Sequence, residues 1–246
     1  MKIEVSESYQ LMSEKCVSDF LEFIKPLKNP LICTASGDTP KGMYKELIKQ
    51  VEEKKIDISG WHFISLDEWA GMNGIDEGSC RDHLNNDLFN PLNIAKDKII
   101  FFDGRAGDLQ AECSKVDDYI NKMGGIDVAI VGLGMNGHVG MNEPGTPANL
   151  HSHIADIDSL TQQVGQKYFK TEQQLTQGLT LGLASLQETS FLMLLANGAR
   201  KSAIVREIFE NDKSSELPAT SLLSHKNISV YLDSEAASLI TPNANG

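Results

Sequence analysis

Residues 127–145 decide the fold class, and they read Asp-Val-Ala-Ile-Val-Gly-Leu-Gly-Met-Asn-Gly-His-Val-Gly-Met-Asn-Glu-Pro-Gly. The apolar run Val128–Val131 is typical of a strand that is buried on both faces of a parallel sheet. Glycines follow at positions 132, 134, 137 and 140, so the backbone can turn tightly and a ligand can approach it closely. Ligands of open parallel sheets bind outside the carboxyl ends of the strands. The segment therefore predicts a fold and a candidate site together.

The rest of the chain alternates short apolar runs with segments of helical period. The predicted strands are Leu31–Thr34, Trp61–Leu66, Lys98–Phe102, Asp127–Gly132, Ser190–Ala196 and Ile228–Leu232. The predicted helices are Ser8–Ile24, Thr39–Val51, Ser79–Leu88, Asp108–Lys122, Glu172–Leu186 and Ala199–Phe209. This alternation predicts an α/β fold, with a Rossmann-like, mostly parallel sheet and helices on both faces. No repeat or long linker interrupts it, so we expect residues 1–246 to form a single domain.

The charge balance limits the classes of partner. The chain has 34 acidic and 22 basic residues and a net charge of −12, which argues against a nucleic-acid or anionic-membrane binder. We therefore expect a small-molecule partner, and an anionic one would need a local group of cations. The sequence has no signal-peptide pattern or membrane-length apolar run, and its 4 cysteines form no CxxC pair. These features predict a cytoplasmic protein with reduced, mostly buried thiols.

The loop after the first predicted strand is a candidate anion site. It contains Ser36, Gly37, Asp38 and Thr39 and leads into a helix. Backbone N–H groups at the start of a helix attract anions, and the two hydroxyls add donors. The loop lacks the G-x4-G-K-[ST] pattern of a Walker A motif. It could equally be an ordinary turn that is capped by Asp38 or Thr39.

The end of the second predicted strand carries a pair of carboxylates, Asp67 and Glu68. Neighbouring side chains on a strand point to opposite sides, so we expect one carboxylate in the site crevice and the other bonded elsewhere. A carboxylate at this end of a strand is well placed to act as a general base. It could also cap the next segment, because Asp commonly begins turns.

The glycine-rich loop itself is the strongest candidate. From Gly132 it matches G-x-G-x-x-G, but an isolated match is weak, and His138, Glu143 and Pro144 stand where a dinucleotide-binding helix would continue. A histidine between Asn136 and Glu143 is suited to carry protons. The alternative is a structural histidine with satisfied hydrogen bonds.

The remaining histidines give weaker signals. A metal site would require His151 and His153 to join His138, and no HExxH or Cys/His ligand spacing is present, so we expect no metal. His62, His83 and His225 lie singly within predicted elements and are expected to be core or surface residues.

The sequence resembles the glucosamine-6-phosphate/galactosamine-6-phosphate isomerase (deaminase) family, whose fold, called NagB-like, is shared with 6-phosphogluconolactonase. The most specific matches are L-D-E-W at Leu66–Trp69 and G-x-N-G-H-x-G-x-N-E-P-G at Gly134–Gly145. The resemblance implies a Rossmann-like sheet that needs no dinucleotide or other cofactor. It also leaves a homo-oligomer possible.

The resemblance implies a specific role for each of these residues. Asp67 would move the proton between C2 and C1 of the open-chain sugar, and His138 would open the ring, oriented by Glu143 and by Asn136. The loop of Ser36, Gly37, Asp38 and Thr39 would bind the phosphate, together with Lys201 and with Lys167, which stands where glucosamine enzymes carry an arginine. Gly134 would let the substrate approach the backbone.

Asn136 departs from the glucosamine enzymes, which carry Asp in G-N-D-G-H. An amide can orient an imidazole but cannot stabilise imidazolium as a carboxylate does. The G-x-N-G-H form, the L-D-E-W motif and the stretch Gly178–Leu183 resemble the galactosamine-6-phosphate isomerase branch. Lost activity is the other interpretation. Residues 145–158 contain no Lys or Arg, so the allosteric site of hexameric relatives is expected to be absent.

The sequence therefore favours a hexosamine-6-phosphate isomerase/deaminase of carbohydrate catabolism that prefers galactosamine 6-phosphate over glucosamine 6-phosphate. One alternative is 6-phosphogluconolactonase, a hydrolase, although that family typically reads G-x-D-G-H-T-A-S-L-F-P where this chain has N-E-P-G. The other is a non-catalytic sugar-phosphate-binding module. Such modules usually carry an N-terminal helix-turn-helix, for which the residues before the first predicted strand are too few and too acidic.

Overall fold

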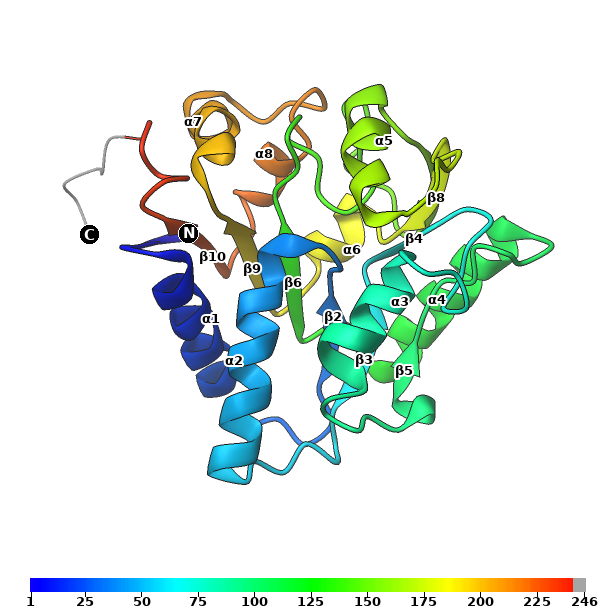
Figure 1. The fold of residues 1–246 in the computed structure, drawn as a ribbon, viewed down its shortest axis with the longest axis horizontal. Helices are drawn as coiled ribbons and strands as arrows, with labels where there is room; N and C mark the ends of the chain where they lie inside the picture. Colours follow the sequence, from blue (N-terminus) through cyan, green and yellow to red (C-terminus); the bar gives the residue numbers. More distant parts are fainter. Residues whose placement is uncertain (241–246) are drawn as a thin grey trace.

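The structure, a computed structural model, describes residues 1–240 and centres on a seven-stranded sheet (Figure 1). The last six residues of the expected domain lie outside the described part. In spatial order the strands are β1 (Lys2–Ser6), β10 (Ile228–Asp233), β9 (Phe191–Ala196), β6 (Val128–Gly132), β2 (Leu31–Thr34), β3 (His62–Ser65) and β5 (Ile99–Ile100). Every neighbouring pair is parallel. The predicted α/β fold with a parallel sheet is confirmed.

Helices cover both faces of this sheet because its strands are apolar on both sides. Leu31 and Cys33 belong to one buried cluster, and Ile32 between them belongs to the other. One face packs against α1 (Tyr9–Ile24) and α2 (Asp38–Lys54), which lie side by side in Figure 1. The opposite face packs against α4 (Leu109–Met123), α7 (Ser202–Glu210) and α8 (Ala219–Leu222). Among the described residues, no helix is both long and apolar enough to cross a membrane.

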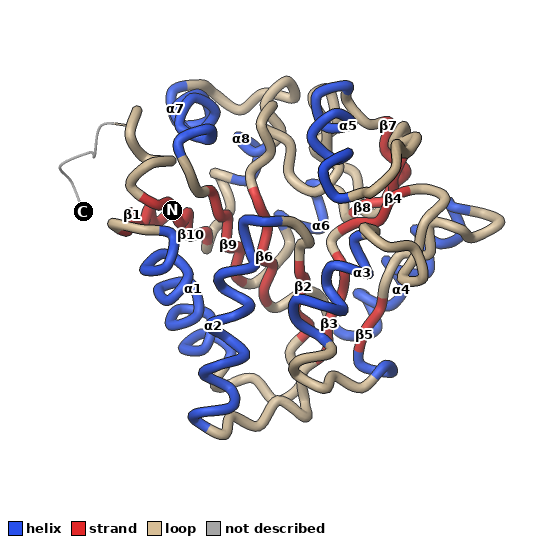
Figure 2. The backbone as a smooth tube through the Cα atoms, viewed as in Figure 1, coloured by secondary structure: helices blue, strands red, loops and turns tan. Residues whose placement is uncertain are grey.

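A second, three-stranded antiparallel sheet lies beside the first, and it corrects the predicted helix Glu172–Leu186. Only α6 (Leu183–Gln187) is helical there. The residues before it form β8 (Gln177–Thr180), which pairs with β4 (Asp67–Trp69) and with β7 (His153–Asp156), shown red in Figure 2.

Close packing explains why the segment is extended rather than helical. A Cβ at Gly178 would overlap the sulfur of Met141, and one at Gly182 would overlap the backbone of Leu150. Both glycines are therefore needed for close approach. Because glycine also weakens a helix interior, the helical pattern of this stretch loses to strand pairing.

The remaining elements are short. They are α3 (Cys80–Leu84), which continues as a π-helix (Asn85–Phe89), α5 (Ser159–Gly165), and 3₁₀ turns at Lys96–Lys98, Gln166–Tyr168 and Ala199–Lys201. The sequence did not predict α5 or β1. It did predict a helix over α3 and the π-helix.

The strand order places the candidate site. From β2 the chain builds outward to β3 and β5, whereas β6 is followed by β9, β10 and β1 on the other side. The order therefore reverses between β2 and β6, which is where open α/β sheets bind ligands. The loops that leave β2, β3 and β6 are the three that the sequence singled out.

Candidate active site

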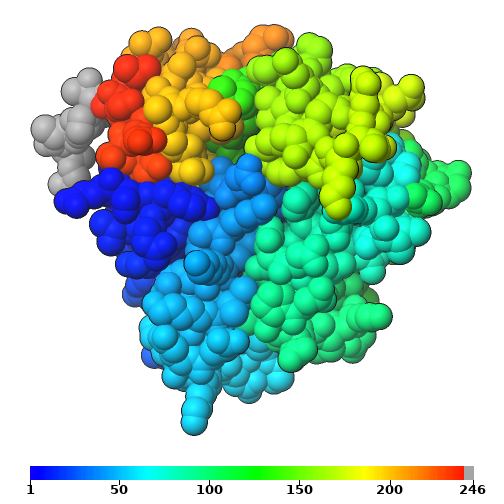
Figure 3. Space-filling view, in the orientation of Figure 1, coloured from blue at the N-terminus to red at the C-terminus, as the bar shows by residue number. Residues whose placement is uncertain are grey.

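A cavity of about 210 Å³ opens where these loops meet. Its wall comes from the loops after β2, β3 and β6, from α3, and from the segment of α5 and the turn that follows it. Figure 3 shows the region around residues 159–175 packed over the first turn of α2 and over α3. Of the predicted site residues, the cavity wall contains Ser36, Gly37, Asp38, Thr39, Asp67, Gly134, His138, Lys167 and Lys201.

Asp67 lies in the wall at the start of β4, beside the thiol of Cys80. Removal from water disfavours its charged form and raises the pKa of its carboxyl to about 6, although a hydrogen bond from Cys80 acts in the opposite direction. A carboxylate of this kind is a stronger base than an exposed aspartate and is still mostly ionised at pH 7. It is suited to accept a proton from carbon.

Glu68 points the other way, into the protein. Its Oε1 accepts hydrogen bonds from the backbone N–H groups of Trp69 (2.8 Å) and Cys80 (3.0 Å), and its Oε2 accepts one from Arg81 (3.0 Å). Burial still raises its pKa, to about 7. This carboxylate ties the start of α3 to β4, and so it fixes Cys80 next to Asp67.

His138 is held by the side chain of Asn136. The Oδ1 of Asn136 lies 3.2 Å from the backbone nitrogen of His138 and 2.6 Å from its Nδ1. A backbone N–H can only donate, so the atom that faces it is the amide oxygen, and Nδ1 must carry the hydrogen that is donated to it. That leaves Nε2 with the free lone pair. Burial and nearby Lys201 lower the pKa of His138 to about 4, so the imidazole is neutral at pH 7.

Glu143 completes this arrangement from behind. Its Oε2 accepts a hydrogen bond of 2.9 Å from Nδ2 of Asn136 and lies 3.5 Å from Nδ1 of His138. Burial raises the pKa of Glu143, whereas hydrogen bonds from Asn136 and Thr161 lower it. The Thr161 hydroxyl also lies 3.1 Å from His138 Nδ1. Asn136 therefore links the carboxylate to the imidazole and fixes which ring nitrogen carries the hydrogen.

Two glycines make room for the histidine. A Cβ at Gly134 would overlap the imidazole of His138, so only glycine fits there. Gly137 has φ of +82°, a backbone conformation that other residues rarely adopt. These glycines therefore allow the loop to fold tightly around its own histidine.

The start of α2 has the expected geometry for an anion site. Gly37 is the N-cap with φ of +99°, and it makes no side-chain cap, so the first turn keeps free N–H groups. Tyr168 packs against this loop, and its hydroxyl accepts a hydrogen bond from the Asp38 backbone. The Tyr168 hydroxyl therefore occupies the Asp38 backbone N–H, a donor that could otherwise bind an anion.

Two lysines converge on the same region. Lys201 donates to the carbonyl of Leu133 at 2.5 Å, and burial with nearby Lys167 lowers its pKa to about 8. Lys167 pairs with Asp38 at 2.7 Å. Asp38 also lies 3.5 Å from Lys41, so its carboxylate neutralises cations at the rim of the cavity.

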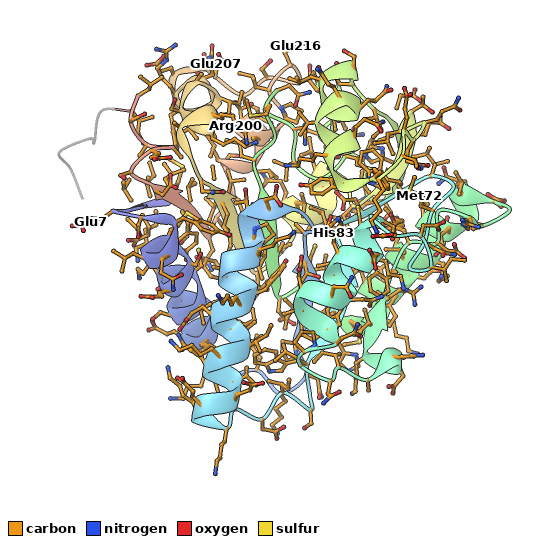
Figure 4. All side chains as sticks on the ribbon, viewed as in Figure 1. Glu7, Met72, His83, Arg200, Glu207 and Glu216 are labelled. Atoms are coloured by element: carbon orange, nitrogen blue, oxygen red, sulfur yellow. The ribbon has the colours of Figure 1, made fainter. Side chains whose placement is uncertain are left out.

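Sequence reasoning missed four residues of this site: Cys80, His83, Thr161 and Tyr168. His83 had been expected in the core or on the surface, yet it lines the cavity, with its ring 4.9 Å from that of Tyr168. Figure 4 labels it where α3 faces the beginning of α2. The spacing of Cys80 and His83 is the usable signal, since residues i and i+3 share one helix face.

The other histidines have structural partners. His153 contacts the Asn142 amide at 3.0 Å, and His151 pairs with Glu188 on the surface. His225 is buried and contacts the Thr189 carbonyl at 2.9 Å. No group of three potential metal ligands is found within residues 1–240. All 4 cysteines are free and buried.

Taken together, fold and cavity define a Rossmann-like α/β protein in which an aspartate with a raised pKa, a neutral histidine and two lysines near a helix N-terminus line one cavity. The chain belongs to the family of glucosamine-6-phosphate isomerases and 6-phosphogluconolactonases, whose family model matches residues 6–231.

Curated relatives match the chain over almost its full length. The chain is 34% identical over 241 residues to a glucosamine-6-phosphate deaminase of Clostridium perfringens strain 13, covering 98% of this chain and 100% of the relative. It is 32% identical over 238 residues to one of Bacillus velezensis, covering 96% and 99%.

Solved structures agree on the fold. A monomeric glucosamine-6-phosphate deaminase superposes with a TM-score of 0.94 at 29% identity, covering 98% of this chain and 100% of that one. The 6-phosphogluconolactonase of Trypanosoma brucei gives 0.74 at 21% identity, with 98% of each chain covered. That second likeness shows a shared fold alone.

Proposed function

We propose that this protein is a hexosamine-6-phosphate isomerase/deaminase that prefers galactosamine 6-phosphate. It converts the amino sugar phosphate and water into the ketose 6-phosphate and ammonia. The observation that carries the proposal is that His138, held by Asn136 and Glu143 from outside the lining, shares one cavity with Asp67. The chain supplies two separate proton-transfer groups, and the reaction needs two, one for ring opening and one for isomerisation.

The phosphate binds at the start of α2, between the loop of Ser36 to Thr39 and the two lysines. Lys201 contributes a buried cation, and Lys167 exchanges Asp38 for the phosphate. The interaction of a dianion with both ammonium groups and with a helix N-terminus offsets the net charge of −12 on the whole chain.

His138 opens the ring. Its Nδ1–H is engaged with Asn136, so Nε2 accepts the proton of the C1 hydroxyl and returns it to the ring oxygen. The C1–O5 bond breaks, and the free aldehyde forms at C1. A low pKa helps here because a neutral imidazole is available as the base at pH 7.

Asp67 then carries out the isomerisation. Its carboxylate removes the C2 proton while O1 takes a proton from water, which gives the enol, and the protonated Asp67 then delivers its proton to C1. The amine-bearing carbon C2 becomes an iminium, which water attacks, and the C–N bond breaks with release of ammonia. The elevated pKa of Asp67 suits both directions of this transfer.

The galactosamine preference rests on Asn136 together with the L-D-E-W and G-L-T-L-G-L stretches of the sequence. Asn136 touches His138, so the residue that departs from the glucosamine enzymes lies beside the proposed ring-opening group. The curated relatives are named glucosamine-6-phosphate deaminases. Glucosamine 6-phosphate is therefore the substrate to compare with galactosamine 6-phosphate.

The test is a set of side-by-side assays. Ammonia release is measured with galactosamine 6-phosphate and with glucosamine 6-phosphate, and hydrolysis of 6-phosphogluconolactone is measured as a third reaction. We expect ammonia from both sugars, with a higher kcat/KM for the galacto compound. A higher value for the gluco compound overturns the preference. Lactone hydrolysis without ammonia release favours the hydrolase, and no turnover of any compound despite binding favours a binding module.

A further inference from the structure

A second cavity, of about 440 Å³, lies on the side of α3 away from the candidate active site. No residue is shared between the two described linings. The second is lined by Asn73, Gly74, Ile75, Arg81, Asn85, Phe89, Asn90, Ile94, Lys96, Ile99 and Phe101. Its size falls in the usual range for small-molecule sites.

The charge of this lining is unusual for the chain. It contains two cations, Arg81 and Lys96, and none of the 34 acidic residues of the sequence. In a protein with a net charge of −12, a cavity of this composition is a local positive site.

The Arg81 side chain packs against Phe101 and Gly74, but its Nε has no hydrogen-bond partner among the described residues. Its guanidinium carbon lies 4.5 Å from the centre of the Phe101 ring, and the missing side chain of Gly74 leaves room for its stem. Its Nε is buried and has no hydrogen-bond partner within the described residues. A buried donor without a partner costs free energy, which a bound acceptor would recover.

Two carboxylates of this region, Asp103 and Asp76, have other partners. Asp103 accepts hydrogen bonds from the Asn73 amide at 3.1 Å and from the Arg105 backbone at 3.0 Å. Asp76 pairs with the Arg105 guanidinium. Asp103 is close enough for Arg81 to contribute to its lowered pKa, but it is not part of the lining.

Part of the lining is apolar. Phe89, Ile94, Ile99 and Phe101 supply it, and the amides of Asn85 and Asn90 lie among the lining residues. Asn85 and Phe89 belong to the π-helix that extends α3, and insertions of this kind are frequent at functional sites.

We propose that this cavity binds a small organic anion, with a carboxylate or phosphate head and a flat apolar body. The head pairs with Arg81 and Lys96, and the body packs against Phe89 and the isoleucines. The guanidinium lies over the Phe101 ring, and its N–H groups are donors of the kind that pair with carboxylate and phosphate.

The test uses the full-length protein and two fluorinated probes, 4-fluorobenzoate and 4-fluorophenyl phosphate. The buffer contains no phosphate, and the variants below distinguish this cavity from the anion subsite of the active site. Binding is followed by fluorine NMR, and we expect one of the two heads to bind measurably at roughly millimolar probe. The tighter probe identifies the head group.

Variants locate the binding. Arg81→Gln should weaken it by about tenfold or more. Lys96→Gln should weaken probe binding by about threefold. Because Lys96 is exposed, this variant should fold normally and so tests the proposal even if Arg81→Gln misfolds. Lys115→Gln, which removes an exposed lysine outside the lining, should leave it unchanged. No binding of either probe, or equal binding by wild type, Arg81→Gln and Lys96→Gln, overturns the proposal.

Discussion

Asp67, the proposed base, lowers the stability of the fold at neutral pH. Its pKa is raised to about 6 in the folded chain, against about 4 for an ordinary aspartate. The folded protein therefore binds a proton that the unfolded chain has already released. Stability is lost as the pH rises from about 4 through about 6, and the loss persists above that range.

Asp67→Asn should separate the two effects. An amide cannot accept the C2 proton, so kcat should fall by about 10²- to 10⁴-fold. The same change removes the buried charge, so the variant should be more stable than wild type at pH 7, by at most about 3 kcal/mol. Urea unfolding at pH 4 and pH 7 measures this difference, which should shrink at the lower pH.

The wild-type pH profile provides the matching observation. The acid limb of kcat/KM should fall near pH 6, because activity needs the ionised carboxylate. An Asp67→Asn variant with near-normal kcat would remove Asp67 from the mechanism. A variant that is less stable than wild type at pH 7 would show that the carboxyl is not penalised by burial.

Asn136→Asp tests the link between Glu143 and His138. The new carboxylate would stand where Oδ1 now lies, 2.6 Å from His138 Nδ1, and would favour imidazolium. The pKa of His138 should rise from about 4 by about one unit or more, which corresponds to roughly 1.4 kcal/mol per unit. An NMR titration of the imidazole measures the shift.

The free energy of unfolding of Asn136→Asp should be lower than that of the wild type. The change replaces a donor to Glu143 by a second carboxylate and so places like charges together. Asn121→Asp, on an exposed turn of α4, is the matched control and should leave the histidine unchanged. An unshifted histidine in Asn136→Asp would mean that Asn136 does not set its charge.

Single residues were predictable where motif spacing placed them after a strand, as for Asp67 and His138. His83 and Tyr168 were not, because their position depends on how α3 and α5 pack over the sheet ends. Thr161 lies 23 residues after His138 in sequence, and it reaches the imidazole only because α5 folds back over the glycine-rich loop.

At the scale of elements, the start of α2 carries a conflict. The helix begins with an acidic residue, Asp38, which favours the helix dipole but places an anion where a phosphate is proposed to bind. Asp38 also holds Lys167 in an ion pair.

Asp38→Asn should release that lysine. We expect KM for the sugar phosphate to fall by about two- to fivefold, in line with the strength of exposed ion pairs, with kcat nearly unchanged. The helix should lose about 0.3–1 kcal/mol of stability. Steady-state kinetics and thermal unfolding check both. Lys41→Gln leaves the Lys167 pair intact and serves as control, and a raised KM in Asp38→Asn would mean that the carboxylate itself contacts the sugar.

The antiparallel sheet of β4, β8 and β7 shows where element prediction fails. The stretch Gly178–Leu183 is short, and apolar residues in it fit both a strand and a helix. Its extended form depends on pairing with Asp67–Trp69, more than a hundred residues earlier. The six predicted strands of the large sheet lacked this ambiguity, because each is a short apolar run bounded by turn residues.

At the scale of the whole molecule, the buried thiols give a test of packing. All 4 cysteines are buried, and burial raises the pKa of Cys16, Cys33, Cys80 and Cys113. Buried thiols with raised pKa values are unreactive. Ellman's reagent should therefore label none of them rapidly in the native protein and all 4 after unfolding.

Cys80 allows a finer version of this measurement, because it lines the candidate active site. Its slow labelling should be suppressed further by the sugar phosphate, whereas labelling of Cys16, inside the core, should not change. Mass spectrometry of the labelled peptides distinguishes the two. Rapid native labelling of Cys16 would contradict the packing of α1 against the sheet.

The position of α3 has a thermodynamic consequence. Cys80 and His83 form part of one cavity wall, and Arg81 forms part of the other. The backbone of Arg81 is also bonded to Glu68, the neighbour of Asp67. If the proposed anion in the second cavity changes the affinity for the sugar phosphate by some factor, thermodynamic linkage requires the sugar phosphate to change the affinity for that anion by the same factor.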